Sequence, residues 1–313
     1  MSKVALSIII PVYNEEESLP LVFSRLRFLK NLPQKHEIIL VSDGSVDKSE
    51  KIIKRHSKKN KKIKLISFTR NFGQQVAIVA GLKFALGDYV GIMDADLQDP
   101  PEKLIEMYQL AQKKGLDIVY ATRKKRKEHF LKKIAYKLFY KFYSLASESP
   151  VDMDSGDFGI LSKRVVAEIN AMPEKVKFVR GLRSWTGYSS ESFPIDRPER
   201  AVGVPKYTIK KLFSLAINGI TSTSTKPLRV ATFFGILFSF ISLFMVIIYV
   251  TAWFFGDLHQ EVPGFVTTIV LMLLFSGLQL FTLGILGEYI ATIFHEVKNR
   301  PTFVIKDKIN IKE

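Results

Sequence analysis

The first 121 residues alternate short apolar runs with helix-forming stretches, and this alternation constrains the fold more than any other feature of the chain. Short β-branched and aliphatic runs bounded by polar turns are typical of buried strands. Strands that alternate with helices form a parallel, doubly wound sheet. We therefore predict an α/β domain with a mostly parallel sheet. The expected strands span residues 4–12, 36–41, 63–68, 89–93 and 117–121, with helices over 16–29, 48–58, 101–114 and a stretch ending at 85.

Polar clusters follow four of these expected strands. They lie at residues 13–15, at Asp43, at 70–75 and at 94–98. In such sheets ligands bind beyond the carboxyl ends of the strands, so the clusters predict one site at a shared edge. The chain has no Gly-x-Gly-x-x-Gly and no Walker-type Gly-Lys-Ser/Thr, which argues against a phosphate cradle of either kind.

Asp94 and Asp96 flank a small Ala directly after the fourth strand. A bend there can turn both carboxylates toward one hard cation and the diphosphate that it carries. The alternative is a polar turn whose carboxylates cap the next helix, before Pro100 and Pro101 end the extended chain. The tripeptide alone leaves both interpretations open.

Residues 230–255 and 265–287 carry no charged side chain, and each run is long enough to cross a membrane as a helix. We predict two membrane spans; two buried helices of a soluble core are the alternative. The loop between them, residues 256–263, has acids but no Lys or Arg. The flanking basic residues are Lys226, Arg229, Lys298 and Arg300. The positive-inside rule then places both termini and the N-terminal domain in the cytoplasm.

The chain has 46 Lys and Arg against 30 Asp and Glu, a formal charge of +16, and no cysteine. A disulfide framework and a thiolate metal site are thereby excluded. The positive charge suits nucleic acid, an anionic membrane or phosphorylated substrates. Residues 123–127 form a basic run, either solvated or part of a binding surface. The following stretch, 128–146, reads as a basic amphipathic helix that lies on a membrane or packs on the core.

A second acidic loop spans residues 152–159, where the acids could cap a turn or complete a transferase site. Further on, Arg200 and Lys206 bracket a Gly/Pro turn. Apolar residues then recur at helical spacing over 209–220, which predicts an interfacial helix that leads into the first span. This places the two cations near headgroup level, where they contact a substrate phosphate or ordinary lipid headgroups.

Together these motifs resemble family 2 glycosyltransferases of the GT-A fold, and most closely the polyisoprenyl-phosphate glycosyltransferases. That group includes dolichol-phosphate mannose synthase and, with two C-terminal spans, bacterial bactoprenol glucosyltransferases. The matching segments are Pro11-Val12-Tyr13-Asn14-Glu15, Asp43-Gly44-Ser45-x-Asp47, Arg70-Asn71-Phe72-Gly73, Asp94-Ala95-Asp96-Leu97-Gln98-Asp99-Pro100-Pro101, Gly156-Asp157-Phe158 and Arg200-x-x-Gly203-x-x-Lys206-Tyr207. The likeness covers nearly the whole chain. Pro205 departs from the Ser that many relatives carry before the Lys.

The resemblance implies transfer of a hexose, glucose from UDP-glucose in the first instance, from a nucleotide diphosphate sugar to a polyprenyl phosphate, with inversion. The implied nucleotide-sugar pocket comprises Pro11, Tyr13, Glu15, Asp43, Arg70, Gly73, Asp94 and Gln98. Asp94 and Asp96 would hold Mg²⁺ or Mn²⁺, and Asp157 would orient acceptor or sugar, or act as a base. The implied acceptor-phosphate residues are Arg200, Lys206 and Tyr207.

We therefore divide the chain into a GT-A catalytic domain (1–165), an acceptor-side segment with a juxtamembrane helix (166–228), two transmembrane helices (229–296) and a cytoplasmic tail (297–313). The expected location is a bacterial inner membrane. The expected partners are donor, acceptor and lipid, not nucleic acid. Self-association through Gly277, Gly284 and Gly287 is also expected.

Two other functions compete with this hypothesis. The charge of +16 suits a membrane-tethered binding protein for anionic polymers, although acids at the strand ends would repel such a ligand. A processive polysaccharide synthase usually has Gln-x-x-Arg-Trp, for which the chain offers only Arg183-Ser184-Trp185. Two spans also make a poor channel for one protomer.

Overall fold

The computed structural model describes residues 4–27, 32–123, 155–175, 177–195, 225–255 and 264–311. These residues divide into two compact units. The first contains the described residues up to 195 together with those from 299 onward, and the second contains 225–255 and 264–298. Four expected features lie outside the described residues: most of the basic run, the amphipathic helix at 128–146, the interfacial helix at 209–220, and Arg200, Lys206 and Tyr207.

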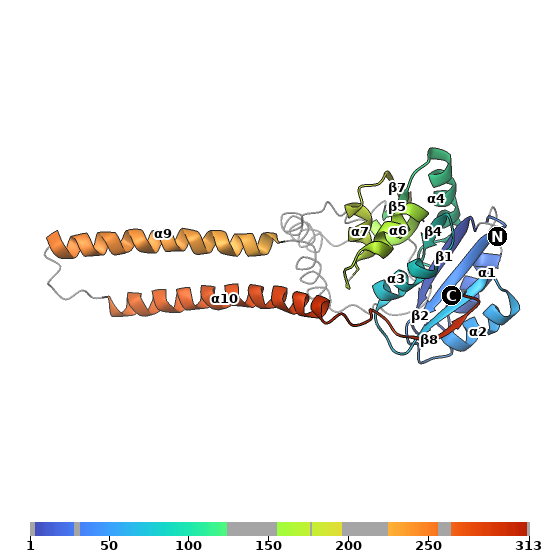
Figure 1. Cartoon of the computed structure of the whole chain (residues 1–313), viewed down its shortest axis with the longest axis horizontal. Coiled ribbons are helices and arrows are strands. Elements are labelled where there is room, and N and C mark those ends of the chain that lie inside the picture. The colour runs from blue at the N-terminus through green and yellow to red at the C-terminus, as the bar shows by residue number, and fades with distance from the viewer. Residues whose placement is uncertain are drawn as a thin grey trace. The chain divides into compact units, whose positions relative to one another are not determined.

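The described strands of the first unit form one eight-stranded sheet in the order β7-β5-β6-β4-β1-β2-β3-β8. Figure 1 shows this sheet with helices on both sides of it. β1 pairs in parallel with β2 and β4, β2 with β3, and β5 with β7. β6 is antiparallel to β4 and β5, and β8 is antiparallel to β3. The strands are β1 (Leu6–Val12), β2 (His36–Ser42), β3 (Ile63–Phe68), β4 (Tyr89–Ile92), β5 (Ile118–Arg123), β6 (Ser155–Ser162), β7 (Ser190–Ile195) and β8 (Ile305–Ile309).

The mostly parallel α/β sheet predicted from the sequence is confirmed. Strand β3 and helix α4 have the predicted bounds, and the other strands and helices predicted within residues 4–121 differ by a few residues at the ends that the structure describes. The structure differs in the C-terminal segment, which the sequence analysis set apart as a tail. Residues 305–309 instead form β8 at the edge of the sheet, because alternate side chains of this strand are half-buried against it.

Helices cover both faces of the sheet. They are α1 (Leu19–Arg27), α2 (Ser49–Lys59), α3 (Gln74–Phe84), α4 (Pro101–Lys114), α6 (Lys163–Ala171) and α7 (Val179–Trp185). Alternate residues of β1 point to opposite faces: Ile8 packs with α1 and α4, and Ile9 with α3 and α6. The apolar layers on both faces hold the register of the strands, and that register determines which residues meet at the sheet edge.

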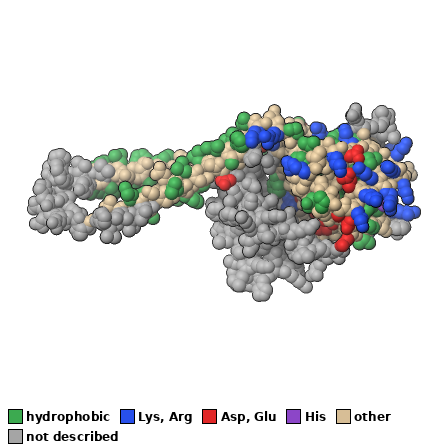
Figure 2. Space-filling model, turned by 90° about the horizontal axis from the view of Figure 1, so that it is seen from below, with side chains coloured by type: hydrophobic (Ala, Val, Ile, Leu, Met, Phe, Trp, Pro, Cys, Tyr) green, Lys and Arg blue, Asp and Glu red, His purple; other side chains and the backbone are tan. Residues whose placement is uncertain are grey.

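The second unit consists of α9 (Lys226–Phe255) and α10 (Phe265–Val297), which lie side by side and run antiparallel (Figure 1). Both are long enough and apolar enough to cross a membrane, as predicted from their composition. Their hydrophobic side chains are exposed along the pair, whereas Lys and Arg gather on the first unit (Figure 2). A methyl group added at Gly277, Gly284 or Gly287 would meet no atom within 4 Å, so self-association through them stays a prediction.

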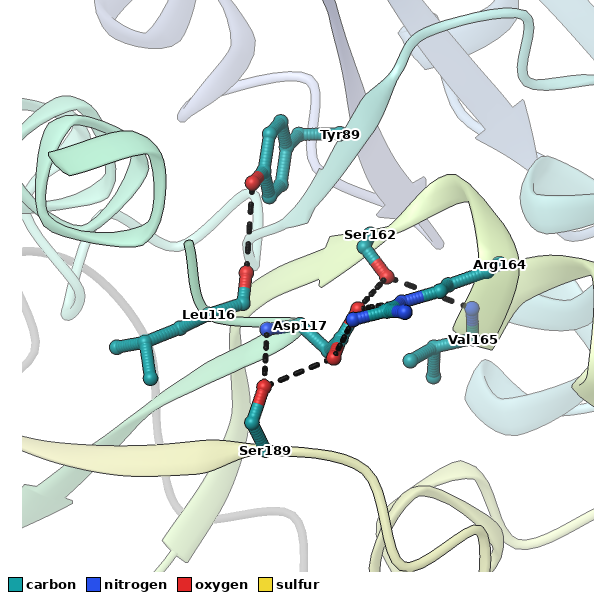
Figure 3. Close-up of polar contacts among 7 residues, drawn as sticks. All are labelled: Tyr89, Leu116, Asp117, Ser162, Arg164, Val165 and Ser189. Carbon is teal, nitrogen blue, oxygen red and sulfur yellow. Dashed lines mark hydrogen bonds and ion pairs between the residues drawn. The ribbon is translucent and has the colours of Figure 1, made fainter. Parts of the chain in front are cut away.

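A buried carboxylate joins three strands at the edge of the sheet that is formed by the amino end of β5. Asp117 accepts hydrogen bonds from the hydroxyls of Ser162 and Ser189, each at 2.8 Å, and forms an ion pair with Arg164 (Figure 3). Tyr89 donates nearby to the carbonyl oxygen of Leu116. Burial opposes ionisation of Asp117, but the donors from Arg164 and the two serines outweigh it and lower the pKa.

We expect Asp117→Asn to lower the free energy of unfolding by about 2 kcal/mol at pH 7, because it removes a buried acceptor for several donors. A carboxyl whose pKa is lowered by folding stabilises the protein above its unfolded pKa, and this stabilisation is lost as the pH falls through the folded pKa. The deficit should therefore shrink below about pH 4. Thermal unfolding of the full chain at both pH values tests this. Glu191→Gln, which breaks an exposed pair with Lys114, is the control with little expected change.

Candidate active site

The candidate site lies at the edge formed by the carboxyl ends of β1, β2, β3 and β4. Because these strands are parallel, the segments that follow them meet on one side of the sheet. β6 runs the other way, so its first residues reach the same edge. The predicted site residues that the structure places here are Pro11, Tyr13, Glu15, Asp43, Arg70, Gly73, Asp94, Asp96, Gln98 and Asp157. Pro11 is buried at the end of β1, beyond the last residue that β4 pairs.

The segments after β1 and β2 are interlocked by hydrogen bonds. The backbone N–H of Glu15 donates to Ser49 Oγ at 2.8 Å, and that of Glu16 donates to Asp47 Oδ2 at 3.1 Å. In return, Asn14 Oδ1 accepts the N–H of Val46 at 2.9 Å. Tyr13, which precedes these residues at the end of β1, is 41% exposed. An exposed aromatic residue therefore lies at the edge where the resemblance predicts a nucleoside.

Asp43 ties the segment after β2 to the segment after β3. Its buried carboxylate accepts the backbone N–H groups of Phe72 at 2.7 Å and Gly73 at 2.9 Å. Burial raises the pKa of Asp43, although these two donors and the Arg70 guanidinium act in the opposite direction. The carboxylate therefore shapes the loop that carries Arg70, whose side chain is exposed.

Asp94, Asp96 and Gln98 lie on the outer side of the turn after β4, because exposure alternates along it and the residues between them are buried. Leu97 has a left-handed φ of 57°, which costs a non-glycine residue about 1–2 kcal/mol. Asp96 Oδ1 accepts the N–H of Gln98 at 3.1 Å, so this oxygen supports the turn, whereas the N-terminus of α4 has no side-chain cap. Strain of this kind persists only where the surroundings impose it, and it is frequent at functional sites.

The first turn of α3 connects this turn to Asp157. Gln74 donates to Asp94 Oδ1 at 2.7 Å, and Gln75 donates to Asp157 Oδ2 at 2.9 Å while accepting the N–H of Val179 at 3.1 Å. Asp157 is buried and forms a two-point ion pair with Arg180, at 2.8 and 3.0 Å. Two acidic segments are thus joined through one helix end.

The site therefore contains three side chains that the sequence analysis did not assign, namely Gln74, Gln75 and Arg180. The two glutamines lie in the polar cluster expected after the third strand, so that cluster was a usable signal. No sequence signal indicated Arg180, because its pairing with Asp157 depends on how α7 packs near the start of β6. Its neighbour Arg183 is buried and donates to the carbonyl oxygen of Gly156 at 3.3 Å.

Asp94 and Asp96 fit a divalent cation that arrives with its substrate. Among the described residues, no three His, Asp or Glu side chains form a metal-ligand group. Mg²⁺ commonly takes one or two protein carboxylates and completes its shell with substrate phosphates and water. Two half-exposed carboxylates on one turn provide such a partial set of hard oxygen ligands.

Residues 7–169 match Glycosyl transferase family 2. The chain belongs to this family and is a glycosyltransferase, as predicted. It is 40% identical over 308 residues to the uncharacterized glycosyltransferase YkcC of Bacillus subtilis (strain 168), an alignment that covers 98% of this chain and 94% of YkcC. It is 39% identical over 307 residues to the SfII prophage-derived bactoprenol glucosyl transferase of Shigella flexneri, which covers 96% and 97% of the two chains.

Solved structures with a similar fold are more distant in sequence. The mannosyltransferase PcManGT of Pyrobaculum calidifontis, in complex with GDP-Man and Mn²⁺, is 14% identical with a TM-score of 0.47, and the alignment covers 96% of this chain and 89% of that one. Glucosyl-3-phosphoglycerate synthase of Mycobacterium tuberculosis is 15% identical with a TM-score of 0.49, and the alignment covers 70% and 78%.

Gly44 sets how closely the segments after β2 and β3 approach each other. A Cβ atom at Gly44 would lie 2.2 Å from the carbonyl carbon of Arg70 and 2.5 Å from the nitrogen of Asn71, and φ is 65°. We expect Gly44→Ala to displace the loop and to lower the free energy of unfolding by well over about 1 kcal/mol. Gly115→Ala is the matched control, because φ is 64° there and a new Cβ meets nothing within 4 Å. Equal losses of thermal stability in the two variants would show that the contact with Arg70 does not matter.

Proposed function

We propose that this glycosyltransferase transfers a hexose, glucose in the first instance, from a nucleotide diphosphate sugar to a polyprenyl phosphate at the cytoplasmic face of a membrane. The observation that carries the proposal is the end-to-end similarity to bactoprenol glucosyl transferases, at 39% identity over 96% of the chain. Two further features support it: the carboxylates gathered at the sheet edge and the two apolar helices.

The donor side of the reaction needs charge neutralisation more than acid-base chemistry. A nucleotide diphosphate leaves well only when its growing negative charge is balanced, which is what a divalent cation supplies when bound at Asp94 and Asp96. Gln74 holds Asp94 in place by its 2.7 Å hydrogen bond. We assign Tyr13, Arg70 and the backbone shaped by Asp43 to the nucleotide.

Asp157 fits a positioning role better than that of a base. Both of its oxygens accept from Arg180, and one also accepts from Gln75. Charge-assisted bidentate bonds of this kind fix the orientation of the carboxylate and engage both of its oxygens. A strong base is also less necessary here, since a phosphate acceptor is already anionic at neutral pH. We infer that Asp157 fixes the start of β6 against α3 and α7.

The acceptor side combines a lipid anchor with cations. Repulsion between an anionic acceptor and a diphosphate is about 1 kcal/mol for unit charges 4 Å apart in water, and more in a drier site. We assign Arg200, Lys206 and Tyr207 to the acceptor phosphate on the resemblance stated above. The net charge of +16 attracts anions, and both proposed substrates are anionic.

The connectivity of the chain supports a topology with two spans. Strand β8, which follows α10, pairs with β3, which precedes α9, so both belong to one folded unit. The chain must therefore lie on the same side of a membrane before and after the two helices. Two crossings satisfy this requirement, and the basic flanks favour the cytoplasm as that side.

Neither competing function has comparable support. The chain belongs to a family of enzymes, and this membership gives no support to the alternative of a binding protein for anionic polymers. The Gln-x-x-Arg-Trp motif of polysaccharide synthases has only a partial counterpart among the described residues, at Arg183-Ser184-Trp185. Arg183 is buried there; it donates to the carbonyl oxygen of Gly156 and lies over the Tyr120 ring.

Asp96→Asn should lower glycolipid formation by about 100-fold or more, because it weakens charge neutralisation in the transition state. The assay combines purified full-length protein, undecaprenyl phosphate and a panel of labelled nucleotide sugars, with Mg²⁺, Mn²⁺ or EDTA. Asp88→Asn, just before the other end of β4, should keep wild-type activity. If wild type made no glycolipid from any donor, the proposed reaction would be wrong; an active, EDTA-insensitive Asp96→Asn would refute only the role of the metal.

A double-mutant cycle tests the role of Asp157. If Asp157 and Arg180 act as one positioning pair, Asp157→Asn and Arg180→Ala should each lower kcat/KM by about 10-fold or more, and the double variant should be little worse than either. Arg180→Lys should restore part of the loss. A base that acts independently of Arg180 would instead give a severe Asp157→Asn defect, a mild Arg180→Ala defect and additive effects.

A further inference from the structure

The C-terminal segment enters the sheet beside the candidate site. In the antiparallel pair, Ile305 lies opposite Phe68 at the carboxyl end of β3, and Ile309 lies opposite Leu65. The segment that precedes β8 therefore reaches the edge where the site residues lie, at Phe68 and Thr69. Without β8, strand β3 would be an unprotected edge strand, so covering that edge is one plain role for the segment.

A series of aromatic contacts extends from this segment to Arg70. Phe303 stacks on Phe68 with ring centroids 5.2 Å apart and an interplanar angle of 18°. Phe68 meets Phe72 edge to face at 5.6 Å and 85°, and the Arg70 guanidinium lies 4.0 Å from the centre of the Phe72 ring. The backbone N–H of Thr69 also donates to the carbonyl oxygen of Val304 at 3.1 Å.

The loop at residues 69–73 is thus fixed from two sides. On one side the Asp43 carboxylate binds the N–H groups of Phe72 and Gly73, and Gly44 contacts the backbone of Arg70. On the other side the loop depends on Phe303 through the buried Phe68 ring. Only residues 298–302 separate Phe303 from the end of α10.

We propose that Phe303 is a positioning residue for the donor site: its stacking on Phe68 fixes Phe72 and so orients the Arg70 guanidinium toward the nucleotide. The inference rests on the proposed function for the identity of the ligand, but not for the coupling itself. Phe303 lies far from the polar motifs in the sequence and belongs to a segment that follows both apolar helices. The second span would then lead directly into an element of the donor site.

The test compares two substitutions in the C-terminal segment of the full-length protein. Phe303→Ala removes the aromatic stack next to the loop. Ile309→Ala weakens the opposite end of β8, which also packs on the core, without touching residues 69–73. Two kinds of measurement are made: steady-state kinetics, which give KM and kcat for UDP-glucose at saturating undecaprenyl phosphate, and hydrogen exchange of the Phe72 and Gly73 amides.

We expect Phe303→Ala to raise the KM for UDP-glucose by about 5- to 10-fold and to leave kcat nearly unchanged. An increase in KM of this size corresponds to the loss of one aromatic pair. The Phe72 and Gly73 amides should exchange faster. Phe303→Tyr keeps the aromatic ring, so it should leave the KM and the exchange rates near wild type. Ile309→Ala should also leave the KM and the exchange rates near wild type. Equal effects of Phe303→Ala and Ile309→Ala would overturn the proposal, since β8 would then act only as an edge cover.

The exchange measurement separates this proposal from the proposed function. Faster exchange in Phe303→Ala alone supports the coupling even if UDP-glucose proves not to be a substrate. Unchanged exchange and KM in Phe303→Ala would refute the positioning role even if the enzyme makes the expected glycolipid. Should Phe303→Ala fold poorly, Phe303→Leu keeps an apolar contact, removes the stack and serves for the same comparison.

Discussion

The site depends on the shared direction and register of β4, β1, β2 and β3. Ile9 of β1 lies opposite Ile39 of β2 and Ile92 of β4, so the three strands reach the same edge at nearly the same level. That register is fixed by side chains that alternate between two buried layers, and a slip by one residue would turn every apolar side chain to the wrong face. The packing of the core therefore determines where the polar segments meet, and the chemistry at the edge follows from it.

The beginning of α3 then decides how those segments are held. Gly73, Gln74 and Gln75 connect in turn to the carboxylates of Asp43, Asp94 and Asp157. Three acids can gather here because each receives amide hydrogen bonds near the positive end of a helix dipole, and one of them is also paired with Arg180. The Gln74 amide donates to Asp94 without adding a charge of its own, and on the proposed function this carboxylate shares a cation with a diphosphate.

The sequence predicted the parts of this site that depend on local pattern. The spacing of apolar residues and the positions of Pro and Gly were enough to predict strand β3, helix α4 and the polar segments that follow four strands. Arg180 and Phe303 could not be predicted in the same way, because each acts through a partner that only the folded sheet brings near. The segment Ile305–Ile309 does alternate apolar and charged residues, but an alternation on its own does not name β3 as the neighbouring strand. The close approach at Gly44 likewise depends on a backbone contact between two distant segments.

Strand β8 also changes what the two apolar helices can do for the reaction. A domain followed by an anchor at one point can rotate about a single linker, whereas here the chain leaves the first unit before α9 and rejoins it after α10. Two attachments restrict the orientations of the domain more strongly than one. For an acceptor confined to a bilayer, such restriction raises the effective concentration of the phosphate at the donor site without any added contact. On the proposed function, the hydrogen bonds between β3 and β8 are therefore part of how a soluble donor and a lipid acceptor are brought together.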